Sequence, residues 1–226
     1  MVIAIDGPAG SGKSTTATNV AEKLGFIHIN TGAMYRGIAL KCIQEDVNIK
    51  YTSQLNYLLT NTKLEFASEG ELTLFMDGVD ISAEITSVQV TDFVSQVSAI
   101  SEVREKLVQY QRKMAEGLNV VLEGRDIGTV VFPNAEFKFF LIADIDERAK
   151  RRMKDMEAKC EIVSLEELIG ELAERDIKDS TREHSPLKKS EDAVEIDTTG
   201  LSIEDQVNCI IENVKNNNIG ARLNNE

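Results

Sequence analysis

Gly7-Pro8-Ala9-Gly10-Ser11-Gly12-Lys13-Ser14 is the stretch that decides the fold of this 226-residue chain. It fits G-x-x-x-x-G-K-[ST], a pattern in which backbone N–H groups point into one concavity and hold phosphate oxygens. A side chain would block that close approach, and three glycines remove the obstacle. An apolar run, Val2 to Asp6, precedes the stretch, and a helical segment from about Lys13 to Leu24 follows it. This order of strand, loop and helix predicts a phosphate-binding loop.

The loop also predicts its ligand. Lys13 has the length to reach β- and γ-phosphate oxygens, and the Ser14 hydroxyl is a suitable ligand for Mg²⁺. The N-terminus of the following helix adds a partial positive charge. ATP together with Mg²⁺ is therefore the expected nucleotide.

The remaining elements predict an α/β fold with a central parallel sheet. Phe26–Asn30 has the character of a second strand and completes a βαβ start. Later patterns predict strands at Asn119–Glu123, Phe137–Ala143 and Ala193–Asp197, helices at Ala33–Glu45, Val88–Ala115, Asp146–Ala158, Leu165–Thr181 and Ile203–Val214, and a frayed polar tail from Asn216.

An antiparallel patch interrupts this α/β pattern. Leu64–Phe66 and Glu71–Met76 have strand character, and Glu69-Gly70 and Asp77-Gly78 are hairpin-turn signals. The patch indicates a small inserted subdomain at about residues 57–97.

Composition limits the classes of partner. Hydrophobic residues make up 42% and charged residues 28% of the chain, and the formal net charge is −13, which disfavours nucleic acid. No apolar run approaches the ~20 residues of a membrane span, and the N-terminus lacks a basic leader. The three cysteines, Cys42, Cys160 and Cys209, are far apart, which favours free thiols in a reducing cytoplasm. A cytoplasmic monomer without nucleic-acid or membrane partners is expected.

Three classes of phosphate-loop protein compete. A GTPase needs an Asn-Lys-x-Asp motif, which the sequence lacks, and a transport or motor ATPase normally has a far larger chain. A small-molecule kinase needs a second anion site. Arg36 follows the second predicted strand, and Arg125-Asp126 follows the strand that ends at Glu123. Loops after strand C-termini line the ligand crevice of an open α/β sheet, so these three residues are expected to converge near the phosphate loop.

Two further groups of arginines have helical spacing. Arginine clamps phosphate through two parallel hydrogen bonds and stays charged, although such groups are often salt-bridged surface. The spacing predicts that each group shares one helix face, the first being Arg175, Asp179 and Arg182 and the second Arg148, Arg151 and Arg152.

Together these residues resemble the bacterial cytidylate kinase (CMP kinase) family of nucleoside monophosphate kinases. The resemblance extends over nearly the whole chain, and its most specific stretch is GRDIGTVVFP, Gly124 to Pro133. The other matched stretches are Thr31–Arg36, Ser95–Val97, Val103-Arg104, Arg175-Asp176 with Asp179 and Arg182, and Leu201–Glu204. The family often has Ser where this chain has Thr31, and both residues carry a hydroxyl.

The resemblance implies a three-layer nucleoside monophosphate kinase fold. Its core is expected at about residues 1–56, 98–145 and 184–226, its acceptor-binding insert at about 57–97, and a short lid at about 146–183. It implies transfer of the γ-phosphoryl group of ATP to CMP and dCMP.

The resemblance also assigns residues by matched position. ATP is assigned to Gly7, Pro8, Ala9, Gly10, Ser11, Gly12, Lys13, Ser14 and Thr15, with Arg148, Arg151 and Arg152 from the lid. The acceptor phosphate is assigned to Arg36, Arg125 and Arg182, the cytosine to Ser95, Arg104 and Asp126, the ribose to Arg175 and Asp179, and further acceptor contacts to Thr31 and Tyr35. The catalytic set is Lys13, Arg125, Asp126 and Arg182.

The base assignment has its own chemical logic. Asp126 would accept from the cytosine N4 amino group and Arg104 would donate to the ring acceptors, whereas uracil would turn an oxygen toward Asp126. The acceptor phosphate has a second pKa of about 6, so no general base is needed and neither His28 nor His184 is expected to be catalytic. Two alternatives stay open: a kinase of another small acceptor such as UMP or AMP, and a non-catalytic nucleotide-dependent regulatory module.

Overall fold

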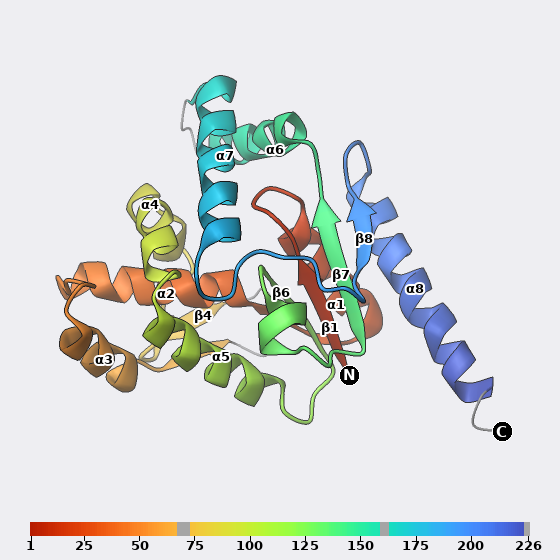
Figure 1. Ribbon diagram of the computed structural model, residues 1–226, viewed down its shortest axis with the longest axis horizontal. Coiled ribbons are helices and arrows are strands. Elements are labelled where there is room, and N and C mark those ends of the chain that lie inside the picture. The colour runs from red at the N-terminus through yellow and green to blue at the C-terminus, as the bar shows by residue number, and fades with distance from the viewer. Residues whose placement is uncertain (67–72, 159–162, 224–226) are drawn as a thin grey trace. The chain divides into compact units, whose positions relative to one another are not determined.

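The computed structural model describes residues 1–66, 73–158 and 163–223 (Figure 1). The chain divides into two compact units. The first, here called the phosphate-loop unit, holds the described residues within 1–28, 118–181 and 185–226. The second, here called the α2–α5 unit, holds those within 29–117 and 182–184.

A parallel sheet organises the phosphate-loop unit. The strand order is β2-β6-β1-β7-β8, and β1 pairs in parallel with both β6 and β7, while β7 pairs in parallel with β8. The bounds are Val2–Asp6 for β1, Ile27–Asn30 for β2, Val120–Gly124 for β6, Phe137–Ile142 for β7 and Val194–Asp197 for β8. This confirms the predicted α/β fold with a central parallel sheet.

Helices bury the sheet, whose central strands are mostly apolar. Ile3, Ala4 and Ile5 have no exposed surface, as expected for a strand covered on both faces. Helices α1 (Lys13–Leu24) and α8 (Ile203–Leu223) contribute Val20 and Ile210 to one cluster with these strands. A separate cluster joins α6 (Ile145–Glu157) to α7 (Leu165–Thr181) and includes Ala9 of the phosphate loop.

The α2–α5 unit has its own hydrophobic core. A three-stranded antiparallel sheet in the order β3-β4-β5 packs with the helices through residues such as Leu64, Leu74 and Leu107. Asp77 and Gly78 both have positive φ, 54° and 83°, which is the type I′ turn that Asp-Gly predicts. The elements are α2 (Thr31–Gln44), α3 (Thr52–Asn61), β3 (Leu64–Phe66), β4 (Leu74–Met76), β5 (Val79–Asp80), a 3₁₀ turn (Glu84–Thr86), α4 (Val88–Val97) and α5 (Ser101–Ala115).

Several predicted bounds were wrong. The single helix expected over Val88–Ala115 is two helices, because the backbone at Ile100 is extended (φ −79°, ψ 127°). The expected tail from Asn216 is helical through Leu223. Helix α3 was not predicted, although Leu55, Leu58 and Leu59 form its buried face. Glu69-Gly70 and the start of the strand predicted at Glu71 lie outside the described residues.

Gly7, the first residue after β1, lies close to the backbone of β7. Gly7 has φ 150°, and a Cβ there would lie 2.1 Å from the Leu141 carbonyl oxygen of β7. We expect Gly7→Ala to lower the free energy of unfolding by about 2–4 kcal/mol in urea titrations, since the clash is with sheet backbone. The matched control is Gly25→Ala, where φ is +68° but nothing lies within 4 Å. It should cost only about 1–2 kcal/mol of left-handed strain, and equal losses in both variants would contradict the clash.

Candidate active site

The phosphate loop is held in shape by residues from distant parts of its own unit. Gly10 and Gly12 have φ 75° and 89°, and a Cβ at each would lie 3.0 Å from Arg148 Cβ and Gln206 Oε1 respectively. Gln206 also accepts a 2.8 Å hydrogen bond from Thr16 Oγ1. These close approaches explain why the loop needs glycine.

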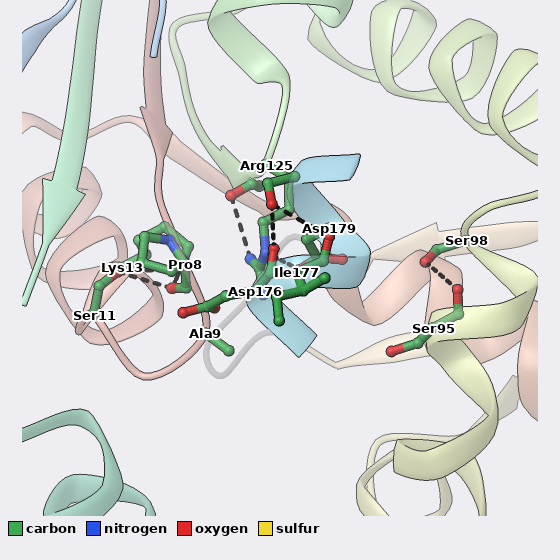
Figure 2. A network of polar contacts seen from close by, with 12 residues as sticks. Pro8, Ala9, Ser11, Lys13, Ser95, Ser98, Arg125, Asp176, Ile177 and Asp179 are labelled. Atoms are coloured by element: carbon green, nitrogen blue, oxygen red, sulfur yellow. Dashed lines mark hydrogen bonds and ion pairs between the residues drawn. The ribbon is translucent and has the colours of Figure 1, made fainter. Parts of the chain in front are cut away.

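Lys13 is a buried cation at the phosphate loop. Its side chain is folded back on the loop, and Nζ donates to the Pro8 carbonyl at 2.5 Å and to Ser11 Oγ at 3.3 Å (Figure 2). Burial, reinforced by Arg125 and Arg175, moves the pKa of Lys13 well below its ordinary value, while Glu123 and Asp6 oppose the shift. A bound anion would relieve this crowding of positive charge.

Glu123 lies behind the predicted metal ligand. Ser14 Oγ donates to Glu123 Oε2 at 2.7 Å, and His28 Nε2 is 3.5 Å from Glu123 Oε1. Burial alone would raise the pKa of Glu123, but His28, Lys13 and Ser14 hold it below its ordinary range. Sequence reasoning missed this residue. The available signal was an acid that ends an apolar strand directly before the Gly124–Pro133 stretch.

Asp6 is a second buried acid that sequence reasoning missed. Its Oδ1 accepts from the Ile127 N–H and its Oδ2 from the Gly128 N–H, both at 2.8 Å. Burial raises the pKa of Asp6 to about 6, the two N–H groups and Lys13 counteract that rise, and Asp126 adds to it. The carboxylate thus fixes the backbone that follows Arg125-Asp126. The available signal was an acid directly before Gly7.

Arg125 is paired across the phosphate-loop unit. Its Nε donates to Asp179 Oδ2 of α7 at 2.9 Å (Figure 2). Asp179 and Asp126 are buried, with 7% and 4% of their surface exposed. The structure therefore brings together Arg125 and Asp179, which were predicted from separate motifs, in the unit that also contains Lys13.

The three arginines predicted for the lid, Arg148, Arg151 and Arg152, lie on α6 with helical spacing. Arg148 donates to the Ala143 and Ala9 carbonyls at 3.1 and 3.2 Å and to Asp176 Oδ2 at 2.7 Å. Arg151 donates to Glu147 at 3.1 Å and to Thr198, whose hydroxyl donates to the Ser11 carbonyl at 3.0 Å. Arg152 is half-buried and makes no ion pair within the described part of the chain. Two of the three arginines thus hold the phosphate loop.

The α2–α5 unit carries the other predicted acceptor residues. Arg104 is buried, donates to the Ser98 carbonyl at 3.0 Å and lies 5.1 Å from the centre of the Tyr35 ring. Arg36 donates to the Ile85 carbonyl and to Thr91 Oγ1 at 3.1 and 3.0 Å.

Ser95 and Thr31 also lie on helices of this unit. Ser95 is half-buried on α4, where its carbonyl accepts from Ser98 Oγ at 3.2 Å (Figure 2). Thr31 is buried in the first turn of α2.

One structural prediction about the arginines was wrong. Helix α7 ends at Thr181, so Arg182 lies one residue beyond it and belongs to the α2–α5 unit. The expected common helix face therefore holds for Arg175 and Asp179 only. Thr15, also predicted to contact ATP, is exposed on the first turn of α1.

Comparisons with known proteins identify close relatives. A family model described as cytidylate kinase matches residues 3–216. A cytidylate kinase from Desulforamulus reducens is 50% identical over 209 residues, covering 92% of this chain and 94% of that protein. One from Fusobacterium nucleatum is 45% identical over 218 residues, covering 95% of this chain and 99% of that protein. A solved gluconokinase from Sinorhizobium meliloti shares the fold at 12% identity, with a TM-score of 0.55 over 100% of this chain and 97% of its own.

The buried Asp6 carboxyl predicts a pH-dependent difference in stability. A carboxyl whose pKa rises from 3.8 to about 6 on folding binds its proton more tightly in the native state. Its contribution to stability therefore grows as pH falls through 6 toward 4. Relative to Asp6→Asn, the wild type should gain about 2 kcal/mol in free energy of unfolding between pH 7 and pH 4.5. Urea titrations of both proteins measure it, and a flat or opposite trend would contradict an ionisable Asp6.

Proposed function

The chain belongs to the cytidylate kinase family, and from this premise we propose how its residues carry the reaction. It transfers the γ-phosphoryl group of ATP to CMP and yields ADP and CDP. The family match favours this activity over the two alternatives left open by the sequence, another acceptor and a non-catalytic module. The observation that carries it is the buried Lys13 beside two arginines at a glycine-rich loop. We extend the proposal to dCMP as a second acceptor.

The reaction requires alignment and charge neutralisation. The γ-phosphate of ATP and the phosphate of CMP are both anions, and they must be held in line. In the proposed mechanism Lys13 binds the β- and γ-phosphate oxygens, and Arg125, Arg36 and Arg182 hold the acceptor phosphate. The CMP phosphate is already ionised near neutral pH, so the attacking oxygen needs no general base.

ATP is held, in this proposal, by the backbone of residues 7–15 and by the α6 arginines. The support is the contact of Arg148 with the Ala9 carbonyl and the link from Arg151 through Thr198 to Ser11. The predicted lid, residues 146–183, comprises most of α6 and α7, whose shared hydrophobic cluster includes Ala9. Closure of this lid would exclude water from the transferred phosphoryl group. The predicted core and the acceptor insert at residues 57–97 stay part of the proposal.

Mg²⁺ belongs to the same proposal. Ser14 Oγ is an oxygen ligand at the start of α1, and its 2.7 Å hydrogen bond to the ionised Glu123 shows that a carboxylate faces it. Mg²⁺ takes few protein oxygens and completes its shell with waters and substrate phosphates. The bound ion would neutralise charge on the phosphates of ATP.

Cytosine recognition is assigned to Asp126, Arg104 and Ser95, and ribose binding to Arg175 and Asp179. The support for Asp126 is its buried carboxylate and its rigid backbone, whose carbonyl accepts from Val130 and Val131 N–H at 2.9 and 3.1 Å. A carboxylate in a fixed place rejects the O4 of uracil, because two acceptors would face each other. Thr31 and Tyr35 are proposed as further acceptor contacts.

The cellular setting is inferred from composition. The net charge of −13 disfavours nucleic-acid binding, and Cys42 and Cys209 are free thiols. Over the described residues, no helix has the length and apolar character that crossing a membrane requires. We propose a monomer that works in the cytoplasm on small nucleotides alone.

The lysine of the phosphate loop gives the first kinetic prediction. Lys13→Ala removes the cation that neutralises the transferred phosphoryl group, so kcat should fall by at least about 10³-fold while the circular dichroism spectrum is unchanged. Lys23→Ala is the matched control, because Lys23 is an exposed lysine of the same helix, whose Nζ donates to Asn208 Oδ1 at 3.2 Å. Unimpaired turnover in Lys13→Ala would refute the role of the loop.

The acceptor panel tests the proposed base recognition. Initial rates of ADP production from Mg-ATP should be high with CMP and dCMP and near the no-acceptor background with UMP and AMP. In Asp126→Ala, kcat/KM for CMP divided by kcat/KM for UMP should fall by about 10²-fold or more. Asp126→Asn, which offers an N–H donor to the O4 of uracil, should raise the UMP rate. An unchanged CMP/UMP ratio of kcat/KM in Asp126→Ala would refute the role of Asp126 in cytosine recognition without contradicting the kinase activity.

A further inference from the structure

One carboxylate connects the two catalytic segments of the phosphate-loop unit. Asp6 is the last residue of β1, and the phosphate loop begins at the next residue. Its two carboxylate oxygens accept from the N–H groups of Ile127 and Gly128, which directly follow Arg125-Asp126. The covalent bond to Gly7 and these two hydrogen bonds leave little freedom between the loop and the Arg125-Asp126 segment.

We propose that Asp6 is a positioning residue for phosphoryl transfer, which sets the Arg125-Asp126 segment in register with the phosphate loop. Asp6 itself is not assigned a contact with either nucleotide. The inference rests on the proposed roles of Arg125 and Asp126 in acceptor binding.

The hydrogen bonds act on the backbone of Asp126 from both sides. Its carbonyl accepts from Val130 and Val131, and the next N–H, that of Ile127, donates to Asp6. The Ile127 carbonyl in turn accepts from the Phe132 N–H at 2.7 Å. The peptide between residues 126 and 127 is therefore held at its oxygen and at its nitrogen. This fixes the direction in which the Asp126 side chain leaves the backbone.

The Lys138 side chain also contacts this segment. A Cβ on Gly128 would lie 3.2 Å from Lys138 Cδ and 3.5 Å from Asp6 Oδ2, so both side chains lie close to Gly128. Lys138 Nζ donates to the Pro133 carbonyl and to Asp192. The segment is thus anchored at residue 128 and again at residue 133.

A carboxylate at position 6 suits a role in holding two backbone N–H groups. Two adjacent N–H groups that point the same way need two acceptors, and a carboxylate provides both, whereas an amide turns an N–H toward one of them. Burying the charge is costly, as the raised pKa of Asp6 shows, and the charged groups that face it are Asp126 and Lys13. A residue needed only for packing would avoid that cost.

Asp6→Asn tests the proposal in the full-length enzyme. At pH 8, where CMP is a dianion and Asp6 is ionised, we expect kcat/KM for CMP to fall about 10- to 100-fold, because the acceptor segment shifts. The Kd of ATP measured by calorimetry without CMP should stay within about threefold. Glu136→Gln is the matched control: its exposed carboxylate accepts from the Val2 N–H at 2.7 Å, at the opposite end of β1 from the loop, and its loss should leave both constants unchanged.

Gly128→Ala perturbs the same contact from the other partner. It keeps the proposal testable if the Asp6→Asn protein does not fold. The added methyl presses on Lys138 and Asp6, so the acceptor constants should worsen in the same direction, by less, with ATP binding kept. Wild-type kinetics for CMP in both variants, or equal losses of ATP and CMP binding in the folded Asp6→Asn protein, would overturn the inference. A wild-type enzyme that fails to phosphorylate CMP would instead refute the proposed function.

Discussion

The burial of the Lys13 ammonium group is the constraint on which the rest of the site depends. A cation with 5% of its surface exposed, beside Arg125 and Arg175, is unfavourable without compensating negative charge. Two buried carboxylates supply it, and both come from the ends of neighbouring parallel strands. In the β1–β6 register Ile5 pairs with Glu123 and Asp6 with Gly124, so the two acids lie at the carboxyl ends of two neighbouring strands. Sheet register therefore sets the electrostatics of the phosphate loop.

This local arrangement also resolves a conflict in the overall charge. A chain with a net charge of −13 repels ATP and CMP at long range. Ionic screening limits that repulsion to about 8 Å at physiological salt, whereas Lys13 and its neighbouring arginines act at contact distance. Short-range cations in a partly dehydrated loop thus outweigh the diffuse surface charge. The acidic surface raises solubility without preventing nucleotide binding.

Sequence patterns predicted the features that depend on near neighbours in the chain. The loop glycines, the βαβ start, helix α7 and the Asp77-Gly78 turn all follow from local chemistry. Asp6 and Glu123 escaped notice because their roles arise from strand pairing across more than a hundred residues. The break between α4 and α5 contains neither glycine nor proline, so nothing local marked it. Arg182 has helical spacing from Arg175 and Asp179 in the sequence, but helix α7 ends at Thr181, one residue before it.

The donor geometry of the α6 arginines refines their assignment to ATP. A guanidinium group has five N–H donors, and Arg148 directs three nitrogens at two carbonyls and Asp176. Arg151 likewise directs its three nitrogens at Glu147 and Thr198. Each keeps at most two N–H groups for phosphate. Moving Arg148 would release the Ala9 carbonyl, and moving Arg151 would release Thr198, whose hydroxyl bonds the Ser11 carbonyl. Arg152 is half-buried and makes no ion pair among the described residues. We infer that Arg148 and Arg151 chiefly maintain the shape of the loop, while Arg152 is the lid arginine best able to meet the phosphates of ATP.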